Sequence, residues 1–478
     1  MTRARKALPN ALAAVAIAAL VWSLFGGHVF LNYDSFYALV WGDDLASGRL
    51  PQFQAPVAPT PHPLAIAAGA LVSPLGDRAE DALLWLGLVA IGALWVGIFR
   101  LGQVLFATSV GVLAALIVAT RVPLLNFGVR GYVDLPALAL VVWAAVLEAR
   151  RPRRGAIVLA LLALAGLLRP EAWLLSAAYW LWLVPARRAS ELARLAVLGA
   201  LAPLLWLLTD GLVTGDPLWS FRGTRELGAE LERPTGLASL PRVLPFRLGE
   251  ILRLPELIAS VVGFSAGIWW LRARTLLPAA LAALNGASYV AFALAGLPLL
   301  GRYLFLAASM LALFAALATL GWRALEADHP ARRRLRAGGV VVLAALVLFA
   351  PTQVDRLEAL RRDIAARDRI QADLLRLVRA PAAAPALAAC QPLYVPNHRP
   401  VPSLAYWTQR RPREVISAQL RAPGPDGAFL APASPEVARL SILDPRDPER
   451  LDARVPAGYR PVARNRSWVL YAGCTAAT

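Results

Sequence analysis

The sequence predicts a polytopic α-helical membrane protein that ends in a small α/β domain. Hydrophobic residues make up 58% of the 478 positions. Many of them lie in apolar runs of roughly twenty residues, which is long enough to cross a hydrocarbon core of about 30 Å. After Ala350 the chain becomes polar and rich in proline. We therefore expect a transmembrane domain over residues 1–350 and a soluble, extracytoplasmic domain over residues 351–478.

The first apolar segment, Ala11–Leu31, is expected to stay in the mature protein as a transmembrane helix. Basic residues precede it, as in a secretory signal, but no small-residue cleavage site comes before Asn32 and more apolar segments follow. These segments bring the expected number of spans to about eleven. They are Leu83–Phe99, Val104–Thr120, Val133–Leu147, Ala156–Leu168, Ala172–Val184, Leu195–Leu212, Pro255–Leu271, Leu276–Leu294, Tyr303–Leu320 and Gly338–Ala350.

Arginine clusters set the expected orientation. With the N-terminus in the cytoplasm, they fall on the cytoplasmic side, as the positive-inside rule requires. The exception is the loop Thr214–Arg253, which is arginine-rich yet expected outside, so either it binds something anionic or the span count slips by one there. The net charge of +18 is assigned to arginines near anionic lipid and not to nucleic-acid binding. The clusters are Arg150/Arg151/Arg153/Arg154, Arg187/Arg188/Arg194, Arg272/Arg274 and Arg332/Arg333/Arg334/Arg336.

The soluble domain is expected to begin with an amphipathic helix at Asp355–Arg379, where apolar residues recur at helical spacing. Strand-like runs follow at Leu393–Val395, Glu414–Ser417 and Trp468–Ala472. The chain's two cysteines, Cys390 and Cys474, both lie in this domain. An oxidising compartment favours a disulfide between them over two buried free thiols.

The stretch Asn32–Leu64 predicts a functional loop on the outer side of the membrane. It holds Asp34, Asp43, Asp44 and His62. Ionisable groups at a membrane edge are candidates for function, although a solvated connector is the alternative. His62 stands in PTPHPL, where three prolines stiffen the backbone, so we expect an exposed side chain that contacts a ligand.

Further span ends offer charge to the same outer face, and this convergence indicates a polar cavity that opens outward. Several of these residues also have structural explanations. Pro170 between Arg169 and Glu171 suits a helix start, and Arg302 with Tyr303 suits a membrane-interface anchor. A helix cap and a turn explain Asp210 and Asp216 more readily than function does. The full set is Arg130, Asp134, Arg169, Glu171, Asp210, Asp216 and Arg302.

At this point the chain resembles a known family. The residues Tyr33-Asp34, the segment FYALVWGDDLASGRLP, the PTPHPL turn, the RPEAW and GRY elements and the outer C-terminal domain resemble the GT-C superfamily of polyprenyl-phosphate-sugar glycosyltransferases. That superfamily includes protein mannosyltransferases, lipid A aminoarabinose transferases and actinobacterial arabinofuranosyltransferases. The resemblance implies inverting transfer of a sugar from a polyprenyl-phosphate donor to a hydroxyl of a glycan, lipid or protein. It also implies a bacterial inner (plasma) membrane, with the reaction on the extracytoplasmic face.

The resemblance implies roles for individual residues. Asp34 stands at the position of the family's catalytic base, although Ser35 replaces the second acid that many members carry. Positive groups or hydrogen-bond donors must hold the leaving phosphate, and the candidates are Arg302, Arg169 and His62. Four further acids are expected to contact the substrate or a divalent cation, and the sequence does not decide between these ligands. They are Asp43, Asp44, Asp134 and Glu171.

A transporter or lipid flippase with an outward-facing polar cavity is the rival interpretation. Transporters often contain internal repeats and broken helices near the middle of the membrane. We find no repeat between the halves of this sequence, and its charges gather at one face. A noncatalytic scaffold that displays the C-terminal domain would leave Asp34 and PTPHPL unexplained. In that domain, Tyr406 and Trp407 would stack on a glycan, or pack in the core.

Overall fold

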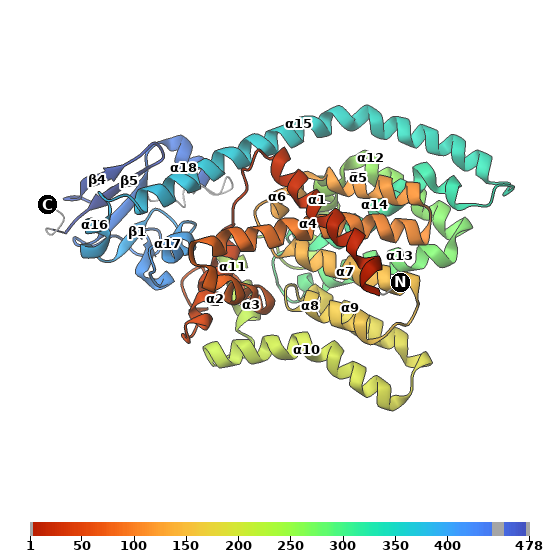
Figure 1. Ribbon diagram of the computed structural model, residues 1–478, viewed down its shortest axis with the longest axis horizontal. Coiled ribbons are helices and arrows are strands. Elements are labelled where there is room, and N and C mark those ends of the chain that lie inside the picture. Colours follow the sequence, from red (N-terminus) through yellow and green to blue (C-terminus); the bar gives the residue numbers. More distant parts are fainter. Residues whose placement is uncertain (1–2, 442–453, 475–478) are drawn as a thin grey trace. The chain divides into compact units, whose positions relative to one another are not determined.

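The computed structural model describes residues 3–441 and 454–474, in two compact units that each combine separate stretches of chain. The first unit contains the residues up to Ser23, His62–Ala65 and Leu84–Leu360. The second contains Leu24–Pro61, Ile66–Leu83 and the described residues from Arg361 onward. The long helix α15, Arg332–Val378, contributes to both (Figure 1). The boundary at residue 350 stays a prediction, while two segments from before it pack into the second unit.

The first unit is a bundle of helices. Its core helix is α14, where every residue but Leu311 and Leu320 is buried, because close helix packing excludes both water and lipid from it. At Gly263 of α12, an added Cβ would lie 1.8 Å from the Phe314 carbonyl oxygen, so only glycine permits this approach. The helices are α1 (Arg3–Leu24), α4 (Ala79–Leu105), α5 (Thr108–Ala119), α6 (Val122–Gly128), α7 (Asp134–Arg150), α8 (Ala156–Gly166), α9 (Glu171–Leu183), α10 (Ala189–Thr214), α11 (Trp219–Glu230), α12 (Leu240–Trp270), α13 (Arg272–Leu294) and α14 (Phe305–Leu320).

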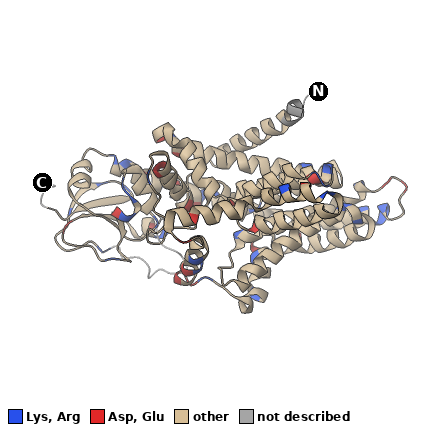
Figure 2. Cartoon of the chain, turned by 90° about the horizontal axis from the view of Figure 1, so that it is seen from below, with Lys and Arg blue, Asp and Glu red and all other residues tan. Residues whose placement is uncertain are grey.

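Large apolar side chains on the outside of this bundle are exposed, among them Leu212, Trp269 and Leu294. The long helices carry little charge over most of their length (Figure 2). Among the described residues, six helices are long and apolar enough to cross a membrane, or seven if the bent pair α5 and α6 counts as one span. The prediction of a multi-pass helical membrane protein is confirmed.

The expected number of about eleven spans is not confirmed. The segments predicted at Val133–Leu147, Ala156–Leu168 and Ala172–Val184 form α7, α8 and α9, with 17, 11 and 13 residues. At 1.5 Å per residue, these helices are about 17–26 Å long, which is short of a core of about 30 Å. Apolar composition alone therefore overstated how many single helices are long enough to cross a membrane.

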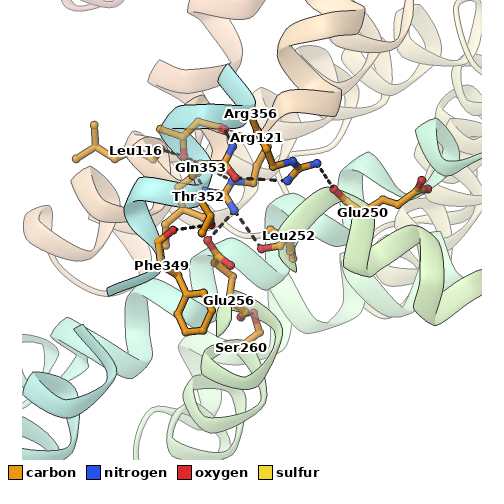
Figure 3. A network of polar contacts seen from close by, with 12 residues as sticks. Leu116, Arg121, Glu250, Leu252, Glu256, Ser260, Phe349, Thr352, Gln353 and Arg356 are labelled. Carbon is orange, nitrogen blue, oxygen red and sulfur yellow. Dashed lines mark hydrogen bonds and ion pairs between the residues drawn. The ribbon is translucent and has the colours of Figure 1, made fainter. Parts of the chain in front are cut away.

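A buried arginine joins two breaks in the bundle (Figure 3). Arg121, 4% exposed, follows the end of α5, where the chain bends by 69° into α6. Its guanidinium donates to the Ile117 carbonyl (2.9 Å) and to the Leu252 carbonyl (3.0 Å). α12 is itself broken at Arg253, which has a φ of +68°. Arg121 therefore supplies hydrogen bonds to carbonyl groups at two helix breaks.

The same arginine forms an ion pair with Glu256 of α12 at 2.6 Å. Helix α15 joins this network within the first unit: Gln353 donates to the Thr120 carbonyl, and Arg356 donates to the Glu250 carbonyl at 3.4 Å (Figure 3). These contacts hold α5, α12 and α15 together close to the bend after α5 and the break in α12.

The second unit is built on a mixed five-stranded sheet with strand order β2-β1-β3-β5-β4. β1 pairs in parallel with β2 and β3, whereas β5 pairs antiparallel with β3 and β4. Three of the strands confirm the sequence prediction. β3 and β4 were missed, because each carries a proline and β4 is a partly exposed edge strand with arginine at both ends. The strands are β1 (Leu393–Val395), β2 (Val415–Ser417), β3 (Ala428–Pro432), β4 (Arg460–Arg464) and β5 (Trp468–Ala472).

The C-terminal part of α15 packs against this sheet. Leu374 and Leu377 belong to a buried cluster with Leu393 and Trp468, which explains the amphipathic pattern seen in the sequence. Short helices surround the sheet, namely α16 (Ala384–Ala389), α17 (Val401–Trp407) and α18 (Pro435–Ser441). A disulfide joins Cys390 and Cys474, whose Cα atoms are 5.5 Å apart.

Helix α2 (Tyr33–Ala46) belongs to the second unit and packs against α17. Trp407 lies edge-on to Phe36 at a centroid distance of 5.4 Å, and its indole N–H donates to Glu80 at 3.0 Å. The Tyr406 hydroxyl donates to the Gly76 carbonyl. Of the two roles that the sequence left open for Tyr406 and Trp407, packing is therefore the one that the structure supports.

Candidate functional site

Four charged residues of the first unit meet at the beginnings of three helical segments. Asp134 begins α7, Glu171 begins α9, and Arg302 lies in the short 3-10 helix Gly301–Leu304 before α14. Arg169 lies in the turn before α9 and bridges two of these elements. Its guanidinium nitrogens lie 3.4 Å from Asp134 Oδ1 and 2.7 Å from Glu171 Oε1. We call Asp134, Arg169, Glu171 and Arg302 the charge cluster.

Arg302 approaches the second carboxylate oxygen of Asp134 at 3.9 Å, so two guanidinium groups converge on one acid. The Asp134 side chain is only 3% exposed. Separations of 3.4 and 3.9 Å are ion-pair contacts that fall at or beyond the limit for a hydrogen bond. Asp134 therefore balances two positive charges without forming a short, directional bond to either guanidinium.

Local sequence explains why the acids of the cluster stand where they do. Asp134 and Glu171 each occupy the first turn of a helix, where a carboxylate is favoured by the helix dipole. Pro170 precedes Glu171 at the N-cap position. The structural explanation that the sequence offered for RPEAW is correct, and the same turn also buries Arg169 among charged and aromatic neighbours.

Aromatic rings line the guanidinium groups. Arg169 lies 4.5 Å from the ring centroid of Tyr303, and Arg302 lies 5.7 Å from the same ring. Arg302 also lies 5.8 Å from the Tyr132 ring and 6.0 Å from the Phe127 ring, distances at which cation–π attraction operates. Sequence reasoning gave Tyr132 and Phe127 no role. The adjacency of arginine and tyrosine in GRY, and their near adjacency in RGYVD, were the available signals.

The electrostatics of the cluster keep Arg169 charged. Burial alone would lower the pKa of Arg169, but the nearby Asp134 and Glu171 carboxylates outweigh it and raise that pKa. His62 shows the opposite effect. Its burial, followed by the charges of Arg169 and Arg302, holds its pKa well below the ordinary value. His62 is therefore a neutral imidazole, and its one N–H is directed at the Leu168 backbone.

His62 is buried, 8% exposed, so the expectation of an exposed side chain was wrong. The ring lies edge-on to Trp206 of α10, with a centroid separation of 5.7 Å. Two residues later, the Leu64 backbone N–H donates to the Leu167 carbonyl at 3.3 Å. The prolines do hold this segment in place, but they hold it against α10 and the turn after α8.

Asp210 and Asp216 have structural roles. Asp210 accepts hydrogen bonds from the backbone N–H and the hydroxyl of Ser220, both at 2.8 Å, in the first turn of α11. Asp216 accepts one from the Leu218 N–H at 2.9 Å. These acids therefore anchor the turn that leads into α11, as the cap and turn interpretations predicted.

In the second unit, Asp34 lies in the first turn of α2 and is half-buried. The Asn32 side chain caps this helix and accepts hydrogen bonds from the N–H groups of Asp34 (2.7 Å) and Ser35 (3.3 Å). Next to it, the Tyr33 hydroxyl donates to the Val57 carbonyl at 2.9 Å. The backbone that carries Asp34 is thus fixed by a cap on one side and a tyrosine anchor on the other.

Asp43 and Asp44 lie at the other end of α2 and share one arginine. Arg49 lies 3.3 Å from Asp43 and 2.9 Å from Asp44, and the Ser73 hydroxyl donates to Asp43 at 2.6 Å. Within the described ranges, no group of three His, Cys, Asp or Glu side chains could hold a metal ion. The structure therefore offers these two acids an arginine and a serine as partners, and no cation site.

No family model matches this chain, and no curated protein matches its sequence. Among solved structures, the chain is similar to the crystal structure of ArnT from Cupriavidus metallidurans bound to undecaprenyl phosphate. The two share 15% sequence identity and a TM-score of 0.55, and the match covers 98% of each chain. At this identity the likeness concerns the fold, and it spans the helical and the C-terminal parts together.

Proposed function

We propose that this chain transfers a sugar from a polyprenyl-phosphate donor to an acceptor hydroxyl. The premise is that the chain has the fold of the GT-C superfamily, as its sequence predicted. The observation that carries the proposal is the convergence of Arg169 and Arg302 on Asp134 inside that fold. Guanidinium groups bind phosphate oxygens through paired hydrogen bonds, and aromatic faces beside them hold the planar groups in place.

The charge cluster suits a leaving phosphate. Its two arginines are balanced by Asp134 and Glu171, and the longer contacts to Asp134 can give way to phosphate oxygens. As the bond from the sugar carbon to the phosphate oxygen breaks, negative charge grows on the phosphate. Interactions that strengthen with that charge accelerate the reaction, because they stabilise the transition state more than the bound substrate. Neutral His62 would contact the phosphate through its one N–H, in place of the Leu168 backbone.

Asp34 is proposed as the general base. Its carboxylate would accept the proton of the acceptor hydroxyl while that oxygen attacks the sugar carbon from the face opposite the phosphate, which inverts the configuration. General-base assistance of this kind contributes roughly 10²–10⁴-fold to a rate. The Asn32 cap and the Tyr33 anchor support this role, because they fix the backbone on which Asp34 is carried.

The remaining features of the sequence interpretation belong to the same proposal. The reaction takes place on the extracytoplasmic face of a bacterial inner membrane, with the N-terminus in the cytoplasm and residues 351–478 outside. The acceptor is a glycan, lipid or protein of the cell envelope. Asp43 and Asp44 support the site through Arg49, and α7, α8 and α9 complete about eleven passes of apolar helix through the bilayer.

A lipid flippase is the second candidate, since two breaks in the bundle resemble the discontinuous helices of transporters. These breaks are the bend between α5 and α6 and the interruption of α12 at Arg253. Reconstituted protein that moved a labelled polyprenyl phosphate across vesicles, with no sugar transfer, would favour this candidate.

Binding of the lipid phosphate that leaves in the reaction tests the phosphate-binding role directly. Purified protein in detergent would be titrated with undecaprenyl phosphate and compared with Arg302→Gln. Loss of a charge-assisted contact worth about 1.5–3 kcal/mol corresponds to about 10- to 150-fold weaker binding. Arg333→Gln serves as the control, because it removes an exposed arginine from the start of α15. Equal affinity of wild type and Arg302→Gln would remove Arg302 from the donor site.

A further inference from the structure

Two helices of the first unit end side by side with arginines. The indole N–H of Trp143 on α7 donates to the Ala93 carbonyl of α4 at 2.9 Å. Near the start of α7, an added Cβ on Gly128 would lie 2.5 Å from the Ile91 side chain of α4 and 3.6 Å from the Leu135 side chain of α7. Further along both helices, an added Cβ on Gly97 of α4 would lie 2.9 Å from a Val142 methyl group of α7. Since Ile91 to Gly97 follows Leu135 to Val142, the two helices run in parallel. Arg100, near the end of α4, and Arg150, the last residue of α7, consequently lie at the same end of the bundle.

The loop that follows α7 has a fixed backbone. Glu148 is buried and accepts hydrogen bonds from the N–H groups of Arg153 (2.7 Å) and Arg154 (3.3 Å). The Tyr179 hydroxyl and the Trp182 indole N–H of α9 donate to the same carboxylate, at 2.7 and 2.9 Å. Both oxygens of Glu148 are therefore engaged inside the protein, and the acid sets the course of the loop.

Three arginines at this end have no acidic partner among the described residues. Arg100 is held by the neutral side chains of Asn10 and Gln103, each at 2.8 Å. Arg150 and Arg154 form no ion pair within 4.0 Å to any described carboxylate. Burial, followed by the like charges of Arg100 and Arg154, lowers the pKa of Arg150. We call Arg100, Arg150 and Arg154 the arginine triad.

The helix that follows the triad has an exposed apolar face. Ile157 of α8 follows Arg154 by three residues and is 45% exposed, and Leu164, two turns further along the same face, is 39% exposed. A group that binds here would therefore present an anion to the triad and hydrocarbon to α8.

We propose that the arginine triad is a binding site for the phosphate headgroup of an anionic phospholipid, whose acyl chains lie along α8. Clustered arginines at the ends of membrane helices attract anionic lipid headgroups, and guanidinium groups bind phosphate oxygens directly. The phosphate chemistry would also fit a free anion, but the exposed leucine and isoleucine side chains favour a lipid. This site is independent of the charge cluster and of sugar transfer, since it shares no residue with either.

Lipid retention by the full-length protein tests the proposal. Protein in detergent would be supplied with dioleoylphosphatidylglycerol or dioleoylphosphatidylcholine, and bound lipid would be counted by native mass spectrometry. We expect wild type to retain the anionic lipid and to gain thermal stability from it, because a ligand that binds the folded state stabilises it. The variant R150Q/R154Q should bind that lipid about 10- to 30-fold more weakly, and the control R333Q/R334Q should bind it as wild type does.

Three results would overturn the proposal. One is equal retention of phosphatidylglycerol by wild type and R150Q/R154Q. Another is a thermal shift with inorganic phosphate as large as that with the lipid, which would assign the site to a soluble anion. The third is loss of lipid binding to the same extent in R333Q/R334Q, which would reduce the effect to net charge. If R150Q/R154Q does not fold, the single change R150Q at an exposed side chain must weaken retention on its own.

Discussion

Replacement of Arg121 offers a test of how the bundle tolerates its two broken helices. In Arg121→Met the side chain keeps most of its volume but loses every donor, so the Leu252 carbonyl loses this partner, while the Ile117 carbonyl keeps the Thr120 hydroxyl. An unsatisfied buried acceptor costs about 1–3 kcal/mol. Glu256, 13% exposed at its side chain, would in addition lose its ion pair, and breaking a buried pair costs about 3–5 kcal/mol.

These costs overlap, because one water molecule or one small helix shift can relieve several of them. We therefore expect the free energy of unfolding to fall by about 3–5 kcal/mol. The assay is reversible unfolding in mixed micelles. Arg121→Met/Glu256→Met should recover part of the loss, since an apolar pair leaves no buried charge behind. Arg356→Gln is the matched control, as its contacts of 3.4 and 3.5 Å are long. A cost below about 1 kcal/mol for Arg121→Met would refute the reasoning.

Three further changes test other parts of the structure. Gly42→Ala should cost about 1–3 kcal/mol, because the added Cβ would lie 2.3 Å from the backbone of helix α3 (Pro63–Val72). Gly223→Ala meets open space and should be tolerated, so equal melting temperatures of the two variants would contradict the prediction. Cys390→Ser should cost about 2–5 kcal/mol, because the disulfide closes a long loop. The unfolding midpoint of the variant should match that of wild type with reductant, and a midpoint equal to that of wild type without reductant would contradict the prediction. Asp134→Asn should cost about 1–3 kcal/mol, less than a fully broken buried pair because Arg169 keeps Glu171, and a stabilised variant would contradict the balance of charge described above.

The sequence predicted features that depend on local pattern. Apolar runs indicated a multi-pass membrane protein, and the spacing of Leu374 and Leu377 indicated a helix with one buried face, which α15 has. Strand-like runs at β1, β2 and β5 were correct, because their residues are bulky and mostly buried. The charged span ends at Asp134, Arg169 and Arg302 were picked out individually, and the structure brings these three together.

Other features depend on contacts between distant segments, which one sequence does not reveal. His62 was expected to be exposed because of its prolines, yet Trp206, 144 residues away by position number, covers it. The packing of residues 24–61 with the C-terminal sheet unit was equally invisible, because it joins stretches separated by most of the chain.

The central claim is that this chain transfers sugar from a polyprenyl phosphate with Asp34 as base. Purified protein in lipid would be offered a panel of polyprenyl-phosphate sugars with envelope glycan acceptors, and released lipid phosphate and extended glycan would both be followed. The account predicts transfer from one donor by wild type and a roughly 10²–10⁴-fold slower rate in Asp34→Asn, with donor binding and melting temperature retained. Transfer by folded Asp34→Asn at the wild-type rate would contradict the assignment of the base. No transfer from any donor by folded wild type, together with movement of lipid across vesicles, would contradict the class.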